Sequence, residues 1–334
     1  MTTVPIPYSL EEFSKRLKKI DGTLGREIKN YLPYWWENEL SDSPGAIQQV
    51  LISFARFASL DIKSVLNTHE PLRFKESNCF YKHANNKEQS DLAAATALVQ
   101  SLANTVARIT VNKFSFFQDA QSIRDDFLNE GKPWVDFKSL VSYCWKHGVP
   151  VLYLPELPVS KKMDAVVVDV NGRPVISLTK KHKHESELLF LLAHEMGHIF
   201  HRHLEQGQTL IDKGVNKPNE HDEQEKQANA FAIKLLTGIE NTHYHSNGKP
   251  LTGNELSKAA KEKSIKNKVD PGHIALNWGH TTGCWGSTQA ALKILYPSPD
   301  WEDYIKDLLC ENIDDDEANE DQLSYLYKLM QVGD

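Results

Sequence analysis

The sequence lacks the features that mark a membrane or secreted protein. Its longest apolar run, residues 188–193, is far shorter than the roughly 18 to 20 apolar residues that a helix needs to cross a bilayer. The opening residues, MTTVPIPYSLEEF, do not place an apolar segment after a basic one, so no secretory signal is expected. The 4 cysteines are scattered and form no CxxC pair. These absences predict a reduced, cytoplasmic protein with no membrane partner.

An excess of positive charge is also absent. The formal net charge is -7, and residues 311–321, ENIDDDEANED, carry seven carboxylates and no base, so the rest of the chain is balanced. A balanced body argues against a large nucleic-acid-binding surface. The acidic run is predicted to be a solvated loop, and the lysine-rich stretch 258–268 the exposed face of a helix.

The N-terminal third reads as helical. Ser9 and Glu12 form a capping box before a first helix, and Pro44 with Gly45 opens a second apolar-periodic segment. A long helix is predicted over residues 89–109. The aromatic cluster in YLPYWWENEL is expected in the core of this helical unit, and the polar stretch 70–89 is expected to be an exposed linker.

From residue 133 onward, helix and strand signals alternate. DFKSLVSYCWKHG predicts an amphipathic helix between Asp136 and Gly148, and VPVLYLP predicts a short buried strand. DAVVVDV and RPVISL flank the Asn-Gly pair at residues 171–172, which predicts a β-hairpin. Pro174 cannot donate to a ladder, so the second strand is expected at an edge of the sheet, where substrate could pair with residues 173–178.

The stretch LLFLLAHEMGHIFHRH follows this hairpin and predicts an apolar-periodic helix. His194 and His198 stand one turn apart, so both imidazoles can reach one cation. This HExxH pattern suits Zn²⁺, and Glu195 lies beside the pair as the predicted catalytic base. A structural reading, a surface helix with incidental histidines, is the alternative.

A catalytic zinc site needs a third protein ligand. The HExxHxxGxxH solution fails because residue 201 is His and residue 204 is Leu. HDEQEKQANAFAIKLLTG predicts a second helix with an apolar stripe that ends at Gly238. Glu225 lies at the edge of that stripe and is the predicted third metal ligand, with Glu223 as its competitor. Asn229 is placed to hydrogen-bond a ligating histidine.

Together, AHEMGHIFHRH and EKQANAFAIKLL resemble the ImmA/IrrE family of bacterial and phage-associated metallopeptidases. The resemblance extends over residues 133–295 and includes DPGHIALNWG, while LLTG at 235–238 departs from the usual ending of the second motif. It implies an α+β, gluzincin-like fold with His194, His198 and Glu225 on the metal and Glu195 as base. It also implies cleavage of a specific regulatory protein, encoded nearby, in stress, mobile-element or phage-defence control.

Three parts of the chain are therefore expected. Residues 1–130 would form a helical N-terminal domain, either a degenerate helix-turn-helix-like unit or a docking unit, with DNA kept as an alternative partner. Residues 131–300 would form the zinc metallopeptidase domain, and residues 301–334 an acidic C-terminal segment with a terminal helix. The rival function is a non-catalytic, zinc-containing regulator that acts by binding DNA or protein.

The remaining histidines receive no catalytic role from the sequence. His201, His221, Tyr244 and His273 are candidates for stabilising an oxyanion, and none is assigned. His182, His184 and His203 are expected to line the surroundings of the site or to face solvent.

Overall fold

The computed structural model describes residues 9–75, 79–81, 86–204, 207, 209–212, 223–246, 248–298 and 300–333. The sheet has five strands in the order β1-β5-β3-β4-β2, and β3 is antiparallel to both of its neighbours. Its outer strands β1 and β2 run parallel to β5 and β4. The strands are β1 (Cys79–Tyr81), β2 (Val151–Tyr153), β3 (Ala165–Val170), β4 (Arg173–Leu178) and β5 (Thr209–Asp212).

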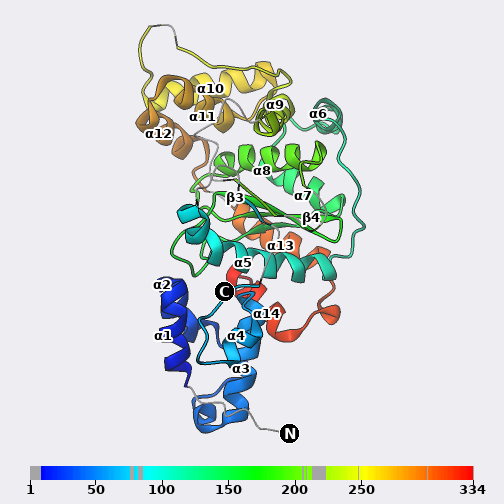
Figure 1. Ribbon diagram of the computed structural model, residues 1–334. Coiled ribbons are helices and arrows are strands. Elements are labelled where there is room, and N and C mark those ends of the chain that lie inside the picture. The colour runs from blue at the N-terminus through cyan, green and yellow to red at the C-terminus, as the bar shows by residue number, and fades with distance from the viewer. Residues whose placement is uncertain are drawn as a thin grey trace.

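Helices surround this sheet, which confirms the expected α+β class (Figure 1). The helices are α1 (Leu10–Ile20), α2 (Gly22–Glu27), α3 (Pro44–Phe57), α4 (Ile62–Leu66), α5 (Asn86–Ile109), α6 (Ala120–Asn129), α7 (Phe137–Lys146), α8 (Glu185–Phe200), α9 (Glu223–Thr237), α10 (Gly253–Asn267), α11 (Pro271–Thr282), α12 (Trp285–Leu295), α13 (Trp301–Asn312) and α14 (Glu320–Met330). Short 3-10 turns lie at Ile28–Tyr31, Asn38–Asp42 and Asp315–Glu317. No helix in the described ranges is long and apolar enough to cross a membrane.

The local signals in the sequence place several of these elements correctly. Ser9 and Glu12 form both bonds of the capping box that opens α1, and Asp136 caps α7. Asn171 and Gly172 both have positive φ, as a tight two-residue turn between β3 and β4 requires. The capping and turn predictions are therefore confirmed.

The edge-strand prediction for β4 is wrong. Residues 176–178 pair with β2 on one side and with β3 on the other, so this half of β4 is interior. Pro174 lies before the point where β2 begins to pair, and there its missing N–H breaks no ladder. Because both sides of β4 are taken over residues 176–178, this segment cannot accept a substrate strand, and that expectation is wrong as well.

Two helices sandwich the sheet. In Figure 1, α8 lies above the strands and α5 lies beneath them, and both contact β3 and β4. The buried side chains of α5, α8 and the strands belong to one continuous hydrophobic core. Helices α10, α11 and α12 pack mainly on one another, with small cores of their own, and α11 contacts α8.

The C-terminal helix packs against the N-terminal third rather than standing apart. Helix α14 contacts α3 and α5, and Figure 1 shows it beside the N-terminal helices. Asp321 in the acidic run accepts hydrogen bonds from Ser53 at 2.7 Å and from Trp35 at 3.1 Å. Most carboxylates of that run are exposed as predicted. Asp321 instead links α14 to the N-terminal third of the chain. The division at residues 130 and 300 stays a prediction.

Two other expectations about the N-terminal third are wrong. Of the aromatic cluster, only Tyr31 is buried, while Tyr34 is 64% exposed and the two tryptophans are half-buried. The polar stretch 70–89 is no mere linker, because it contains β1, which extends the sheet by pairing with β5. Strand β1 has too few residues to show a periodic signal, so only the pairing reveals it.

Candidate metal centre

Helix α8 carries both histidines of HEMGH on a face that is sealed from solvent. His194, Glu195 and His198 are each 0% exposed. The helix begins with Glu187 bonded to the backbone N–H of His184, so its first turn is capped. Because the helix buries apolar side chains against the sheet, its orientation over the strands is fixed by packing. Both imidazoles therefore face the same neighbouring element, α9.

Helix α9 approaches α8 unusually closely at Gly197. A β-carbon at Gly197 would lie 2.9 Å from both the Cα and the carbonyl oxygen of Ala228, and 3.1 Å from the Cβ of Phe231. Only a glycine in α8 and a small residue in α9 permit this approach. Gly197 of HEMGH and Ala228, the first alanine of EKQANAF, are thus explained by one contact, which brings the first turn of α9 to the histidines.

The far end of α9 is anchored by a buried arginine. Arg124 of α6 is 4% exposed, and it donates to the carbonyls of Leu236 at 2.8 Å and Lys268 at 2.6 Å. These carbonyls lie at the C-terminal ends of α9 and α10, where a cation is favoured by the helix dipole. Burial lowers the pKa of Arg124, but a guanidinium stays charged. Arg124 therefore fixes α9 relative to α6 and α10.

Glu225 is brought to the two histidines by this arrangement. Its carboxylate oxygens lie 3.3 Å from Nε2 of His194 and 3.4 Å from Nε2 of His198, and the two Nε2 atoms are 3.0 Å apart. Ligands at about 2.0–2.1 Å from a tetrahedral zinc lie about 3.3–3.4 Å from one another. The two imidazoles and the carboxylate, which faces one imidazole with each oxygen, thus lie close to the spacing of ligands that share one zinc ion.

The competing carboxylate points elsewhere. The side chain of Glu223 is 74% exposed and lies 4.0 Å from Lys226, whereas that of Glu225 is 13% exposed. His194, His198 and Glu225 form a group that could hold a metal ion. Their role as ligands stays a prediction.

Hydrogen bonds on the outer side of each imidazole show where its proton lies. Asn229 Oδ1 can only accept, so His194 carries its proton on Nδ1, 3.1 Å away. Gln227 Oε1 accepts from Nε2 of His203 at 2.8 Å, which leaves a lone pair on the Nδ1 of His203. That lone pair accepts from Nδ1 of His198 at 2.8 Å. In the tautomers that satisfy these outer hydrogen bonds, both histidines of α8 direct an Nε2 lone pair toward Glu225.

Two nitrogen lone pairs and one carboxylate converge on the same point as a result. Such a cluster of acceptors is unfavourable in a buried place unless a cation lies between them. Neutral imidazoles and a carboxylate are also the ligand types that zinc prefers. The residues present therefore fit a divalent metal in both spacing and protonation.

None of the candidate oxyanion donors belongs to this group in the described part of the chain. His201 is exposed at the end of α8, and Tyr244 packs in the core beside α11. His273 is 4% exposed and stacks on Phe190, which itself stacks on His194, so Phe190 separates the two imidazoles. His221 lies outside the described residues.

The three surrounding histidines have different environments. His184 is buried and His182 pairs with Glu187 at 3.7 Å, so both belong to the beginning of α8. His203 contacts His198 directly. Asn229 was found from its place on the helix and His203 was expected near the site, but its contact with His198 and the role of Gln227 were missed by sequence reasoning. No helical spacing relates His203 to His198, since they are five residues apart.

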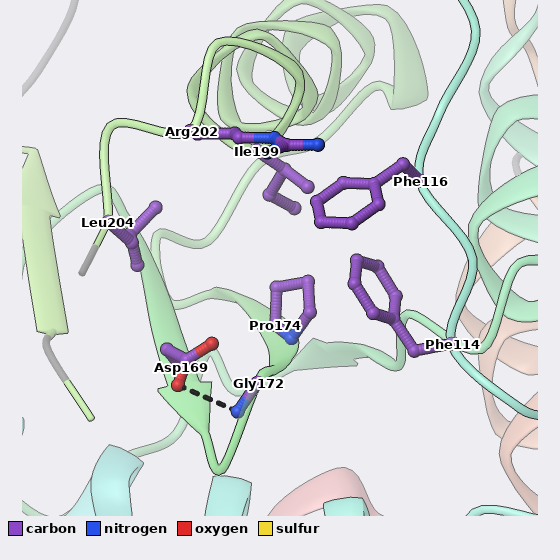
Figure 2. A pocket seen from close by; sticks show the side chains of 8 residues that line it. All are labelled: Phe114, Phe116, Asp169, Gly172, Pro174, Ile199, Arg202 and Leu204. Carbon is purple, nitrogen blue, oxygen red and sulfur yellow. Dashed lines mark hydrogen bonds between the residues drawn. The ribbon is translucent and has the colours of Figure 1, made fainter. Parts of the chain in front are cut away.

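A pocket of about 340 Å³ opens at the C-terminal end of α8. Figure 2 shows Arg202 extended across the top of this pocket, with its guanidinium 4.4 Å from the ring centre of Phe116. The turn between β3 and β4 closes the bottom, where the N–H of Gly172 donates to Asp169 at 3.0 Å. The pocket is lined by Phe114, Phe116, Asp169, Gly172, Pro174, Ile199, Arg202 and Leu204.

At the other end of α8, a second cluster buries acidic groups. The hydroxyl of Tyr296 donates to Asp270, whose oxygens lie 2.8 and 2.9 Å away. Burial raises the pKa of Asp270 to about 6. Burial, followed by the nearby charge of Asp270, raises the pKa of Glu185 to about 7. Burial also lowers the pKa of His273 to about 4, so this imidazole is neutral.

Comparison with known proteins agrees with this geometry. Residues 144–240 match the family model Peptidase_M78, described as the IrrE N-terminal-like domain. This part of the chain is therefore similar to the ImmA/IrrE family. The match runs from α7 through α8 and α9 and covers less than a third of the chain. No curated protein and no solved structure matches the chain significantly.

Proposed function

We propose that the protein is a zinc-dependent endopeptidase that cleaves one specific protein partner. The observation that carries this proposal is the convergence of the Nε2 atoms of His194 and His198 and the Glu225 carboxylate on one point. Two histidines and a carboxylate are a ligand set of catalytic zinc sites, in which the fourth position stays open. The Peptidase_M78 match supports a peptidase and not a purely structural site.

Each residue has a distinct role in this proposal. His194, His198 and Glu225 hold the metal, which when bound acidifies water and polarises the scissile carbonyl. Glu195 takes a proton from the attacking water and delivers it to the leaving amine. Its complete burial keeps this carboxylate away from bulk solvent. Asn229 orients His194 through the bond between its Oδ1 and the imidazole Nδ1.

The partner is proposed to be a regulatory protein, such as a repressor encoded nearby, in stress, mobile-element or phage-defence control. The resemblance to the ImmA/IrrE family supports this choice. Residues 1–130 are proposed to dock the partner, since helices α1–α4 are joined to the rest of the molecule by buried contacts. A reduced, cytoplasmic location follows from the scattered cysteines.

The test compares the wild type with Glu195→Gln in cells that contain the natural partner. New protein N-termini are identified by mass spectrometry, and the zinc content of both purified proteins is measured. We expect partner-derived N-termini with the wild type alone, at equal zinc content. If both proteins yield the same N-termini and the same cellular effect, the peptidase proposal fails, and a non-catalytic regulator of DNA or protein becomes the better explanation.

A further inference from the structure

His203 and Gln227 form a hydrogen-bonded chain that ends on His198. The Nδ1 atoms of His203 and His198 are 2.8 Å apart, and Nε2 of His203 lies 2.8 Å from Oε1 of Gln227. We propose that His203 and Gln227 are positioning residues that hold the proton of His198 on Nδ1 and so keep its Nε2 ready for metal. This inference rests on the proposed function, because it concerns the same metal.

The turn that ends α8 brings His203 back to His198. The N–H of His203 donates to the carbonyl of His198 at 3.0 Å, and the N–H of Arg202 donates to that of Ile199 at 3.1 Å. This pair of bonds is the Schellman motif, in which the residue after the cap adopts a left-handed conformation. Arg202 occupies that position with a φ of 56°. The chain therefore folds back on the last turn, and residue 203 lies against residue 198.

The direction of the proton chain follows from its outer end. An amide oxygen accepts only, so Gln227 requires the proton of His203 to lie on Nε2. The Nδ1 of His203 is then a pure acceptor for His198. Without Gln227, His203 could carry its proton on Nδ1 instead, where it would meet the Nδ1–H of His198. His198 would then favour a proton on Nε2, and this tautomer cannot bind a metal.

The two histidines of α8 are thus held by different acceptors. Asn229 on α9 accepts directly from His194, whereas His198 needs His203 as an intermediate before it reaches Gln227 on the same helix. Helix α9 consequently supplies Glu225 and fixes both imidazoles. We infer that the orientation of the whole ligand set depends on α9.

The experiment measures the affinity of the full chain for Zn²⁺ by competition with a chromophoric chelator. Loss of an outer partner of a metal-binding histidine typically costs about 10- to 100-fold in affinity, and we expect this loss for His203→Ala. His203→Asn places an amide oxygen where Nδ1 stood, so it should keep most of the affinity. Gln227→Leu should weaken binding and Gln227→Glu, which keeps an acceptor, should restore it.

His201→Ala is the matched control. The ring of His201 stacks on that of His203 with centroids 5.5 Å apart, but the side chain is exposed. The absorption spectrum of bound Co²⁺ reports ligand geometry, and we expect it to change in His203→Ala and not in His201→Ala. Circular dichroism verifies that each variant is folded.

Two results would overturn the inference. One is a His203→Ala protein with the zinc affinity and Co²⁺ spectrum of the wild type. The other is an equal loss in His203→Asn and His203→Ala, which would indicate packing and not hydrogen bonding. Because no readout involves cleavage, a failed peptidase test with Glu195→Gln leaves this result standing, and the two failures can be told apart.

Discussion

At the beginning of α8, Glu185 lies near Asp270 and Tyr296, and toward its end His194 and His198 lie against Glu225. Both places remove ionisable groups from water. At the first, burial raises the pKa of Asp270 to about 6 and that of Glu185 to about 7, so both carboxyl groups keep their protons to a higher pH than usual. At the second, both Nδ1 atoms are hydrogen-bonded on the outer side, and the Nε2 atoms face Glu225.

This difference separates a cluster in which burial favours protons from a cluster whose side chains could hold a metal ion. A buried carboxylate is costly without a counter-charge, and the two clusters meet that cost in different ways. At the beginning of α8, burial favours the protonated form of both Asp270 and Glu185, and the nearby charge of Asp270 adds to this effect for Glu185. Toward the end, acceptors outside the imidazoles contact both Nδ1 atoms, and the Nε2 atoms lie beside the Glu225 carboxylate. The following experiments test this contrast, from the largest expected effect to the smallest.

Removal of the Glu225 carboxylate should have the largest effect on zinc binding. Glu225→Ala leaves two imidazoles without the third donor, so we expect zinc binding to fall by more than the roughly 100-fold that loss of an outer partner can cost. Zinc content is measured by mass spectrometry after dialysis. Glu223→Ala is the matched control, because that side chain is 74% exposed two residues earlier. Stoichiometric zinc in Glu225→Ala would exclude this residue as a ligand.

Separation of α8 and α9 should have the next largest effect. In Gly197→Ala the new β-carbon meets the backbone of Ala228 at 2.9 Å, so the helices must move apart. Overpacking of this kind costs about 1–3 kcal/mol, and the shift also carries Glu225 away from the histidines. Urea denaturation and zinc titration measure both effects.

Gly286→Ala in α12 provides the control for this variant. A β-carbon there meets nothing within 4 Å, and alanine is the better helix former by up to about 1 kcal/mol. We therefore expect Gly286→Ala to be slightly stabilising and to bind zinc normally. Equal stability of the two variants would contradict the close approach of α8 and α9.

The cluster of Glu185 and Asp270 at the beginning of α8 should make the stability of the fold depend on pH. The pKa of Glu185 is about 7 in the folded state against an ordinary value of 4.5, so its proton stabilises the fold at low pH. This contribution is lost as pH rises from about 4.5 to about 7. We expect Glu185→Gln to match the wild type at pH 4 and to be more stable at pH 8, as measured by chemical denaturation.

Glu187, two residues further along α8, should behave in the opposite way. Burial raises its pKa, but hydrogen bonds from His182 and Gln289 outweigh burial and lower the pKa to about 2. Its stabilising effect is present above the ordinary value of 4.5 and is lost as pH falls from there toward 2. Glu187→Gln should therefore be less stable than the wild type at pH 7. The same sign for both variants at neutral pH would contradict the contrast.

The smallest effect concerns the left-handed residue that ends α8. Arg202→Gly and Arg202→Val both remove the guanidinium from the ring of Phe116, and they differ in backbone preference. Glycine adopts a φ of 56° freely, whereas valine strongly disfavours it, so we expect Val to be less stable than Gly by about 1–2 kcal/mol. Thermal unfolding measures the difference. Indistinguishable variants would show that the turn does not depend on residue 202.

Local patterns in the sequence predict a large part of the fold. The capping residues before α1 and α7 and the Asn-Gly turn act over a few residues, so their effect can be predicted from the local sequence. The apolar stripe on α9 can be predicted for the same reason, and it places Glu225 on the side that meets α8. The fold class and the family resemblance were confirmed in this way.

Non-local pairing is what the sequence did not reveal. Strand β2 pairs with β4, although β3 lies between them in the chain. This pairing makes β4 an interior strand, so the prediction of an edge strand is wrong. Strand β1 joins β5 from more than 100 residues away in the chain. Helix α14 returns to α3 through contacts such as that of Asp321 with Ser53. Each depends on which surfaces meet after folding, and no local period encodes that choice.

The sequence by itself determined the elements of the candidate metal centre: a helix with His194 and His198 one turn apart, and a second helix with Glu225 at the edge of its apolar stripe. Helical periodicity fixes these relations because it acts within one element. Only the tertiary structure decided the distances among the three donors, the contact at Gly197 and the link from His203 to Gln227. These depend on the approach of two helices and on a left-handed turn, and packing of the whole molecule sets both.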